Sequence, residues 1–77
     1  MTLDQWLTGM RRSAEDFGKE LGCSGQAVRH WRTGARMPDA EMAETIRTKT
    51  AGAVTIADLH AMRLAFLRGD KPAGEAA

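Results

Sequence analysis

The feature that most constrains this fold is a very short link between two helical segments, residues 14–21 and 25–33. Gly22 stops the first segment, because glycine readily adopts the left-handed conformation that closes a helix. Only Cys23 separates it from Ser24, which is a favourable N-cap for the second segment. A link this short forces the two helices to cross steeply and at close range.

Gly18 stands in the middle of the first segment, where glycine costs about 1 kcal/mol relative to alanine. Close approach of the second helix would explain why so small a residue is present there. The alternative is that glycine is merely tolerated at this position. We predict the former, with Gly18 at the contact between the two helices.

The rest of the chain also shows the apolar spacing of helices, and no segment alternates as a strand does. Start and stop signals predict five helices, over roughly 3–11, 14–21, 25–33, Pro38 to near 50, and 56 to about 68. Pro38 is expected in the first turn of the fourth helix. The tail 69–77 is polar and rich in glycine, proline and alanine, so we expect it to be disordered. The prediction is an all-α, compact five-helix domain over residues 1–68.

Composition excludes several classes of function. The single Cys23 allows no internal disulfide, and with only two histidines beside it the chain offers no credible zinc site. No apolar run is long enough to span a membrane, and the first residues lack the pattern of a signal peptide. An enzyme is not expected, because the chain has no suggestive nucleophile–base pair and no glycine-rich phosphate loop. We expect a cytoplasmic protein with no cofactor, no metal, no membrane association and no small-molecule ligand.

Charge is distributed unevenly along a chain whose net charge is only +1. Residues 24–37 contain three arginines and no acid, whereas residues 39–44 contain three acids and no base. A basic stretch in a near-neutral chain indicates one electropositive face, which is what binding to a phosphate backbone requires. Arg11 and Arg12 could extend that face, although the dipole at the end of a helix explains two cations there equally well.

Residues 25–33 divide into two faces of a helix. Val28 and Trp31 are three residues apart and are expected to face the core. The opposite, outward face carries residues at offsets 0, 3, 4 and 7, which are Gln26, Arg29, His30 and Thr33. Arginine pairs well with the O6/N7 edge of guanine, and glutamine with the N6/N7 edge of adenine. An ordinary solvated face is the alternative, but the tight turn, the lack of acids and the arginines that follow favour DNA binding.

The same region resembles a known family. The turn at Gly22 and the sequence W-R-T-G-x-R-x-P over 31–38 look like the Cro/repressor-type (XRE-like) helix-turn-helix. The later part of the chain is similar to the Cro-like YdaS-type subgroup through Ile46, Thr50, Gly52, Val54, Thr55, Leu59 and Arg63. The resemblance covers about residues 1–63. Gly18 and Gly25 depart from it, because they stand where larger residues are more usual.

This resemblance implies a helix-turn-helix over about residues 14–33, whose second helix enters the major groove of DNA. The base-contacting residues that it implies are Gln26, Arg29 and His30. The contacts that it implies to the DNA backbone come from the ends of that helix and the following loop, namely Ser24, Gly25, Arg32, Thr33 and Arg36. The family also suggests a transcriptional repressor of phage-derived or toxin–antitoxin origin.

The last predicted helix has more apolar surface than so small a domain can cover. We expect two of its sides to form a dimer or partner surface, with Leu59, Met62 and Phe66 on one and Leu64 and Leu67 on the other. The predicted function is sequence-specific binding to double-stranded DNA, by a homodimeric regulator on an operator with two half-sites. The alternative is a protein-interaction module with weak DNA binding. Its last helix would bind a protein partner such as RNA polymerase, a toxin or a co-regulator.

Overall fold

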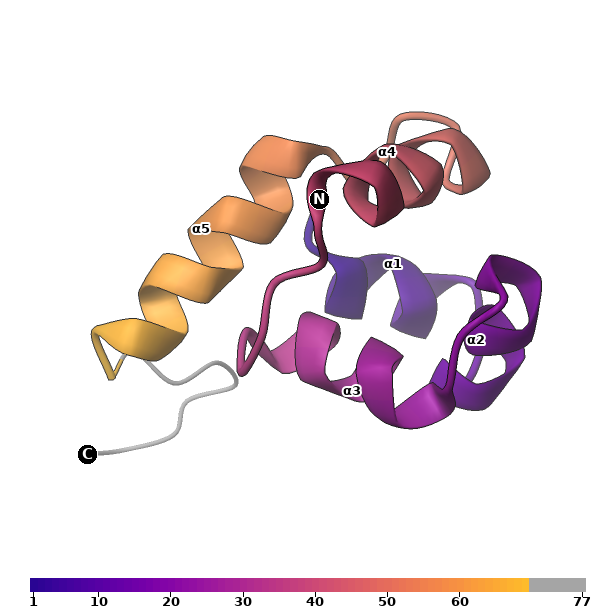
Figure 1. Ribbon diagram of the computed structural model, residues 1–77, viewed down its shortest axis with the longest axis horizontal. Coiled ribbons are helices and arrows are strands. Elements are labelled where there is room, and N and C mark those ends of the chain that lie inside the picture. The colour runs from indigo at the N-terminus through magenta and orange to yellow at the C-terminus, as the bar shows by residue number, and fades with distance from the viewer. Residues whose placement is uncertain (70–77) are drawn as a thin grey trace.

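A computed structural model describes residues 1–69 of the chain. Within them lie five α-helices and no strand: α1 (Leu3–Gly9), α2 (Ala14–Leu21), α3 (Gly25–Thr33), α4 (Ala40–Lys49) and α5 (Ile56–Leu67). Figure 1 shows α3 along one side of the bundle and α4 along the opposite side, with α1 between them and α2 and α5 at the two ends. The predicted all-α, five-helix architecture is therefore confirmed for this part of the chain. The predicted disordered tail, 69–77, lies outside the described residues except for Gly69.

Each of these helices begins after a polar residue whose side chain accepts a hydrogen bond from a backbone N–H three residues on. These N-caps are Thr2, Ser13, Ser24, Asp39 and Thr55. They satisfy N–H groups that have no partner within the helix. The expectation that Pro38 lies in the first turn of α4 is wrong, because Asp39 is the cap and accepts from the Met42 N–H at 2.8 Å. The proline instead precedes the cap.

Two of the helices end on left-handed residues that are not glycine. α1 stops at Gly9, short of the predicted Arg11, because Arg11 has a φ of 56° and turns the chain. The N–H of Arg12 then donates to the carbonyl of Leu7 at 2.9 Å, as in a Schellman motif. Ala51 follows α4 in the same conformation, with a φ of 54°. In contrast, α2 and α3 have the predicted bounds and close on left-handed glycines.

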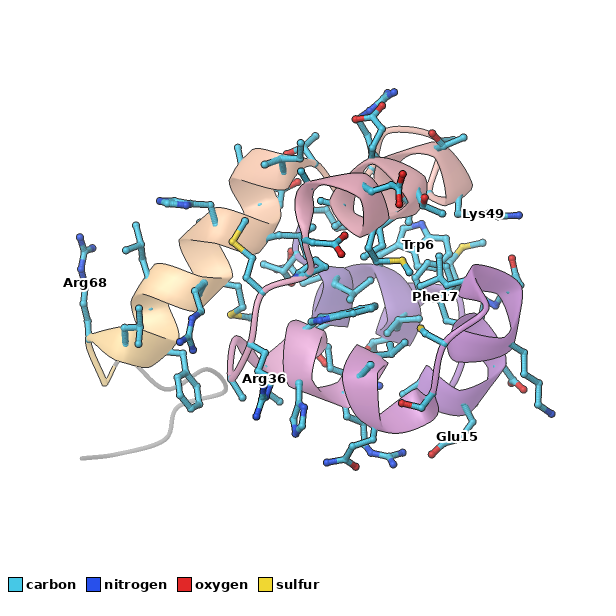
Figure 2. The ribbon with its side chains drawn as sticks, in the orientation of Figure 1. Trp6, Glu15, Phe17, Arg36, Lys49 and Arg68 are labelled. Carbon is cyan, nitrogen blue, oxygen red and sulfur yellow. The ribbon has the colours of Figure 1, made fainter. Side chains whose placement is uncertain are left out.

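The core is organised around Phe17, whose side chain is fully buried. The Trp6 ring packs against it with the centroids 5.1 Å apart, and both rings lie in the interior in Figure 2. The guanidinium of Arg12 covers this pair, 6.0 Å from the Trp6 centroid and 5.8 Å from the Phe17 centroid, and forms an ion pair with Glu20. Arg12 thus has a role in the fold. The other buried apolar residues are Leu3, Leu7, Ala14, Val28, Ala43, Ile46, Val54 and Leu59.

Gly18 lies where α2 meets the link to α3. A Cβ atom there would sit 2.9 Å from the carbonyl oxygen of Cys23 and 3.1 Å from the carbonyl carbon of Ser24. Both neighbours are backbone atoms, so neither can move aside easily. The Cys23 N–H also donates to the Gly18 carbonyl at 2.8 Å. The predicted close approach at Gly18 is confirmed, and the nearest atoms belong to the link and the N-cap of α3.

α5 is attached to the end of α3 through Gly34 and Arg63. Nη1 of Arg63 donates hydrogen bonds to the carbonyl oxygens of Gly34 at 2.9 Å and Ala35 at 2.7 Å. Gly34 is buried with a φ of 88°, and a Cβ atom there would lie 3.0 Å from the carbonyl carbon of Met62. These contacts fix the backbone just after α3, immediately before Arg36.

Protonation of Asp58 is expected to lower the stability of the fold at acid pH. Its carboxylate accepts a hydrogen bond from the Thr55 backbone N–H at 3.0 Å and pairs with the Met1 ammonium, also at 3.0 Å. These contacts, the backbone bond above all, hold the pKa of Asp58 below its ordinary value. The ionised carboxylate stabilises the fold above its unfolded-state pKa of about 3.9, and this contribution is lost as the pH falls through the lower folded-state pKa.

We therefore expect the thermal unfolding midpoint of Asp58→Asn to change less with pH than that of the wild type below about pH 4. The measurement is a series of circular dichroism melts on both proteins across the acid range. Parallel pH profiles for the two proteins would contradict the assignment.

Candidate nucleic-acid interface

The outward side of α3 is formed as predicted from the helical period. Val28 is fully buried, and Trp31 is half-buried against the core. On the opposite side, Gln26 and Arg29 are exposed and His30 is half-buried. We refer to these last three residues as the α3 face.

The side chains of the α3 face are joined by hydrogen bonds. Nη2 of Arg29 donates to Oε1 of Gln26 at 3.1 Å. Nε2 of Gln26 lies 3.0 Å from Nε2 of His30, and the amide can donate there only while that ring nitrogen carries no proton. Hydrogen bonds therefore link the three polar side chains into one row along the helix.

Glu15 of α2 lies beside the α3 face, although the sequence patterns did not predict it as a site residue. Its carboxylate forms an ion pair with Arg29, which lies 14 residues further along the chain. The hydrogen bond from Arg29 is the main cause that lowers the pKa of Glu15. In Figure 2 the side chain of Glu15 projects from the same edge of the molecule as α3. The one available signal was Gly25, because a residue without a side chain at the start of α3 leaves space for a neighbour.

The residues at the two ends of α3 have local structural roles. The hydroxyl of Ser24 accepts from the Ala27 N–H at 3.1 Å and caps the helix. Gly25 lies against Glu15, since a Cβ atom there would sit 2.9 Å from the Glu15 Cγ. Thr33 is exposed and its hydroxyl accepts from the Ala35 N–H at 3.3 Å. Ser24 and Thr33 are both at the surface beside the α3 face.

Two predicted backbone contacts, Arg32 and Arg36, have different surroundings. Arg32 turns toward α1, where its Nε and Nη2 lie 2.9 and 2.8 Å from Oδ1 of Asp4, and its side chain is only 23% exposed. Its guanidinium therefore pairs with α1, and its contact with the DNA backbone stays a prediction. Arg36 is exposed and forms no ion pair with any residue in 1–69. Figure 2 shows its side chain projecting beside α3.

The predicted apolar surface on α5 is smaller than expected. Leu59 does not belong to it, because its side chain is 3% exposed and lies in the core. Met62 and Leu64 are half-buried, so Leu64 is less exposed than predicted. Phe66 and Leu67, at the C-terminal end of the helix, are 40% and 61% exposed. The exposed part of this surface therefore lies in the last turn of α5.

Residues 1–69 hold a few further features that bear on possible sites. No group of three or more His, Cys, Asp or Glu side chains is arranged to hold a metal ion there. None of the described helices combines the length and apolar character needed to cross a bilayer. A shallow hollow lies on α4, lined by Glu41, Glu44, Thr45, Thr48 and Lys49, and it is remote from the α3 face. Burial raises the pKa of the Cys23 thiol, which disfavours the reactive thiolate.

Comparison of the chain with known protein families, with characterised proteins and with solved structures finds no match. What the geometry establishes is a compact all-helical fold over the described residues. Its candidate site is the α3 face, with Glu15 and Arg36 beside it. A function has to be argued from the chemistry of these groups.

Proposed function

We propose that this protein is a helix-turn-helix DNA-binding regulator of the Cro/repressor type, with α2 and α3 as the motif and α3 as the recognition helix. One observation carries the proposal above the others. A hydrogen-bonded row of exposed Gln26 and Arg29 with half-buried His30 lies on a helix whose opposite side packs into the core. A major groove is about 12 Å wide and admits one such helix, and these side chains can pair with base edges.

Contacts to phosphate would position the domain on the duplex. Arg36 lies in the loop that follows α3. It is an exposed cation without an acidic partner in residues 1–69. Ser24, Gly25 and Thr33 offer hydroxyl and backbone groups at the two ends of the helix. Contacts of this kind supply affinity and fix orientation but carry no sequence information. Sequence preference would come from the α3 face.

The proposed activity is repression by a homodimer in the cytoplasm, bound to an operator whose two half-sites lie about one helical turn apart. Phe66 and Leu67, in the last turn of α5, are exposed apolar side chains that a second copy of the chain could contact.

Two alanine variants test the division between base reading and phosphate contact. The operator is first identified by selection from random duplexes with the wild-type protein. Arg29→Ala should then cost about 1–3 kcal/mol of binding free energy on the operator and relax the preference at one base pair.

Arg36→Ala should weaken binding to all duplexes alike and reduce the slope of log K against log salt by about 0.9. Fluorescence anisotropy titrations at several salt concentrations measure both effects. Equal losses on operator and random duplex for Arg29→Ala would refute its role in base reading.

A second candidate function is favoured by the same two exposed residues of α5. Phe66 and Leu67 could bind a protein partner such as RNA polymerase, a toxin or a co-regulator, with DNA binding weak or absent. The charge-reversal experiment described in the Discussion separates the two candidates.

A further inference from the structure

We propose that Glu15 is a specificity-determining residue of the α3 face, which orients Arg29 for a base edge and withholds its charge from phosphate. This inference rests on the proposed DNA-binding function. Glu15 itself is a positioning residue, because it would act through Arg29 and need not touch the DNA.

The geometry around Arg29 is the first support. Its Nη1 pairs with the Glu15 carboxylate, and its Nη2 donates to Oε1 of Gln26 at 3.1 Å. Two separate anchors, one on each terminal nitrogen, fix the rotation of the guanidinium plane. Each anchor uses one N–H, so the guanidinium keeps further donors that can meet an acceptor in a groove.

The second support is the space that the backbone leaves for Glu15. A Cβ atom on Gly25 would lie 2.9 Å from the Cγ and 3.0 Å from the Cδ of Glu15. The glutamate side chain therefore runs across the first residue of α3, where only glycine leaves it room. The Cα of Glu15 is also 3.1 Å from that position, so α2 and the start of α3 approach closely whatever the conformation of the Glu15 side chain.

A contribution to the stability of the fold does not explain the ion pair between Glu15 and Arg29. Glu15 and Arg29 have side chains that are 58% and 48% exposed, and ion pairs this accessible to solvent contribute little to folding. At a surface that faces phosphates, a carboxylate is also unfavourable for non-specific binding. Its presence is therefore better explained by an effect on recognition.

The effect follows from what each kind of contact requires. A phosphate attracts any cation, and a guanidinium already neutralised by Glu15 adds little to that attraction. The O6/N7 edge of guanine instead requires two N–H groups in a fixed orientation. A pre-oriented arginine meets this requirement without losing further side-chain freedom on binding. Arg36, which has no such partner within residues 1–69, would supply the non-specific charge.

The test compares Glu15→Gln with Glu44→Gln. Glu44 is the matched control, because it is an exposed glutamate that pairs with Arg47, and that pairing lowers its pKa as Arg29 lowers the pKa of Glu15. It lies on α4, on the opposite side of the bundle from α3 (Figure 1). Both variants remove one negative charge, so a general electrostatic effect is common to them.

Glu15→Gln is expected to raise affinity for a random duplex about threefold and to steepen the salt dependence by about 0.9, because Arg29 becomes free to contact phosphate. It is expected to lower affinity for the selected operator about fivefold to tenfold, because the guanidinium is no longer oriented for a base. Glu44→Gln should leave the ratio of operator to random affinity unchanged. In an Arg29→Ala background, Glu15→Gln should no longer alter that ratio.

Two outcomes would overturn the inference and they differ in what else they reject. If the wild type selects a sequence but Glu15→Gln shifts operator and random affinities by the same factor, as Glu44→Gln does, Glu15 is only a surface charge. The DNA-binding proposal then survives. If the wild type selects no sequence at all, the proposed function fails and the role of Glu15 fails with it. Matching circular dichroism melts for the variants establish that the fold is retained in each comparison.

Discussion

Replacing Gly34 with alanine is expected to destabilise the fold by about 2–5 kcal/mol. Gly34 has a φ of 88°, a conformation that costs residues with a Cβ atom about 1–2 kcal/mol. The added Cβ would also lie 3.0 Å from the carbonyl carbon of Met62 and 3.0 Å from the Cβ of Phe66. Relieving that overlap requires α5 to move away from the end of α3, and overpacking of this kind costs about 1–3 kcal/mol more. A domain of this size has a free energy of unfolding of about 4–11 kcal/mol, so the loss is a large fraction of it.

Gly22→Ala is the control for Gly34→Ala. Gly22 has a similar φ of 78°, but a Cβ atom there would meet nothing within 4 Å. Its replacement should therefore cost only about 1–2 kcal/mol, the backbone contribution alone. Urea denaturation followed by circular dichroism gives both values. Equal destabilisation by the two variants would show that α5 is not packed against Gly34 as described.

The Gly34 contact also bears on the candidate site. Arg63 binds the carbonyls of Gly34 and Ala35, so α5 fixes the segment that leads from α3 to Arg36. Variants that loosen α5 are therefore expected to reduce DNA affinity through Arg36 even where the α3 face is intact. By holding this segment in place, α5 supports the candidate site. This role does not require its exposed last turn to bind a partner.

Much of this fold was predictable from residues that begin and end helices, because each of them acts on the adjacent turn of its own helix. Ser24 and Gly34 flank α3, and its bounds agree with the prediction at both ends. The end of α1 was not predictable in this way, because Arg11 adopts the left-handed conformation without being glycine. The next residue, Arg12, covers the Trp6 and Phe17 rings and pairs with Glu20 of α2, and these tertiary contacts are not visible in a local pattern. Pro38 shows a similar ambiguity, because proline is compatible with the first helical turn and with the position before an N-cap.

The candidate site was predictable only where it depends on one helix. The period of α3 separates Val28 from Arg29 without any knowledge of the neighbouring helices. Glu15 was missed because its pairing with Arg29 depends on how α2 lies across α3. The pairing of Arg32 with Asp4 of α1 was not predictable for the same reason, because it depends on how α1 lies against α3. Pairing between helices decides which of several similar arginines is available to a ligand.

Arg29 and Arg36 are the two cations that the proposal places at the DNA interface. Removing both charges should therefore lower DNA affinity strongly. Reversing two charges together, with Arg29→Glu and Arg36→Glu, is expected to lower affinity for every duplex by at least about 100-fold at moderate salt, or about 2.7 kcal/mol. The fold should be retained, because both side chains are exposed and neither lies in the core. Anisotropy titrations on operator and random duplexes measure the loss.

The matched control is Arg47→Glu with Lys49→Glu on α4. Arg47 pairs with Glu44 as Arg29 pairs with Glu15, and Lys49 forms no ion pair within residues 1–69, as Arg36 forms none. Figure 2 shows Lys49 and Arg36 on different sides of the molecule. The control changes net charge by the same amount, so it removes only long-range attraction, which salt screens within about 10 Å at 0.1 M. A much smaller loss for the control would assign the interface to α3. Equal losses would mean that DNA responds only to net charge, and the exposed end of α5 would then become the better candidate for the functional surface.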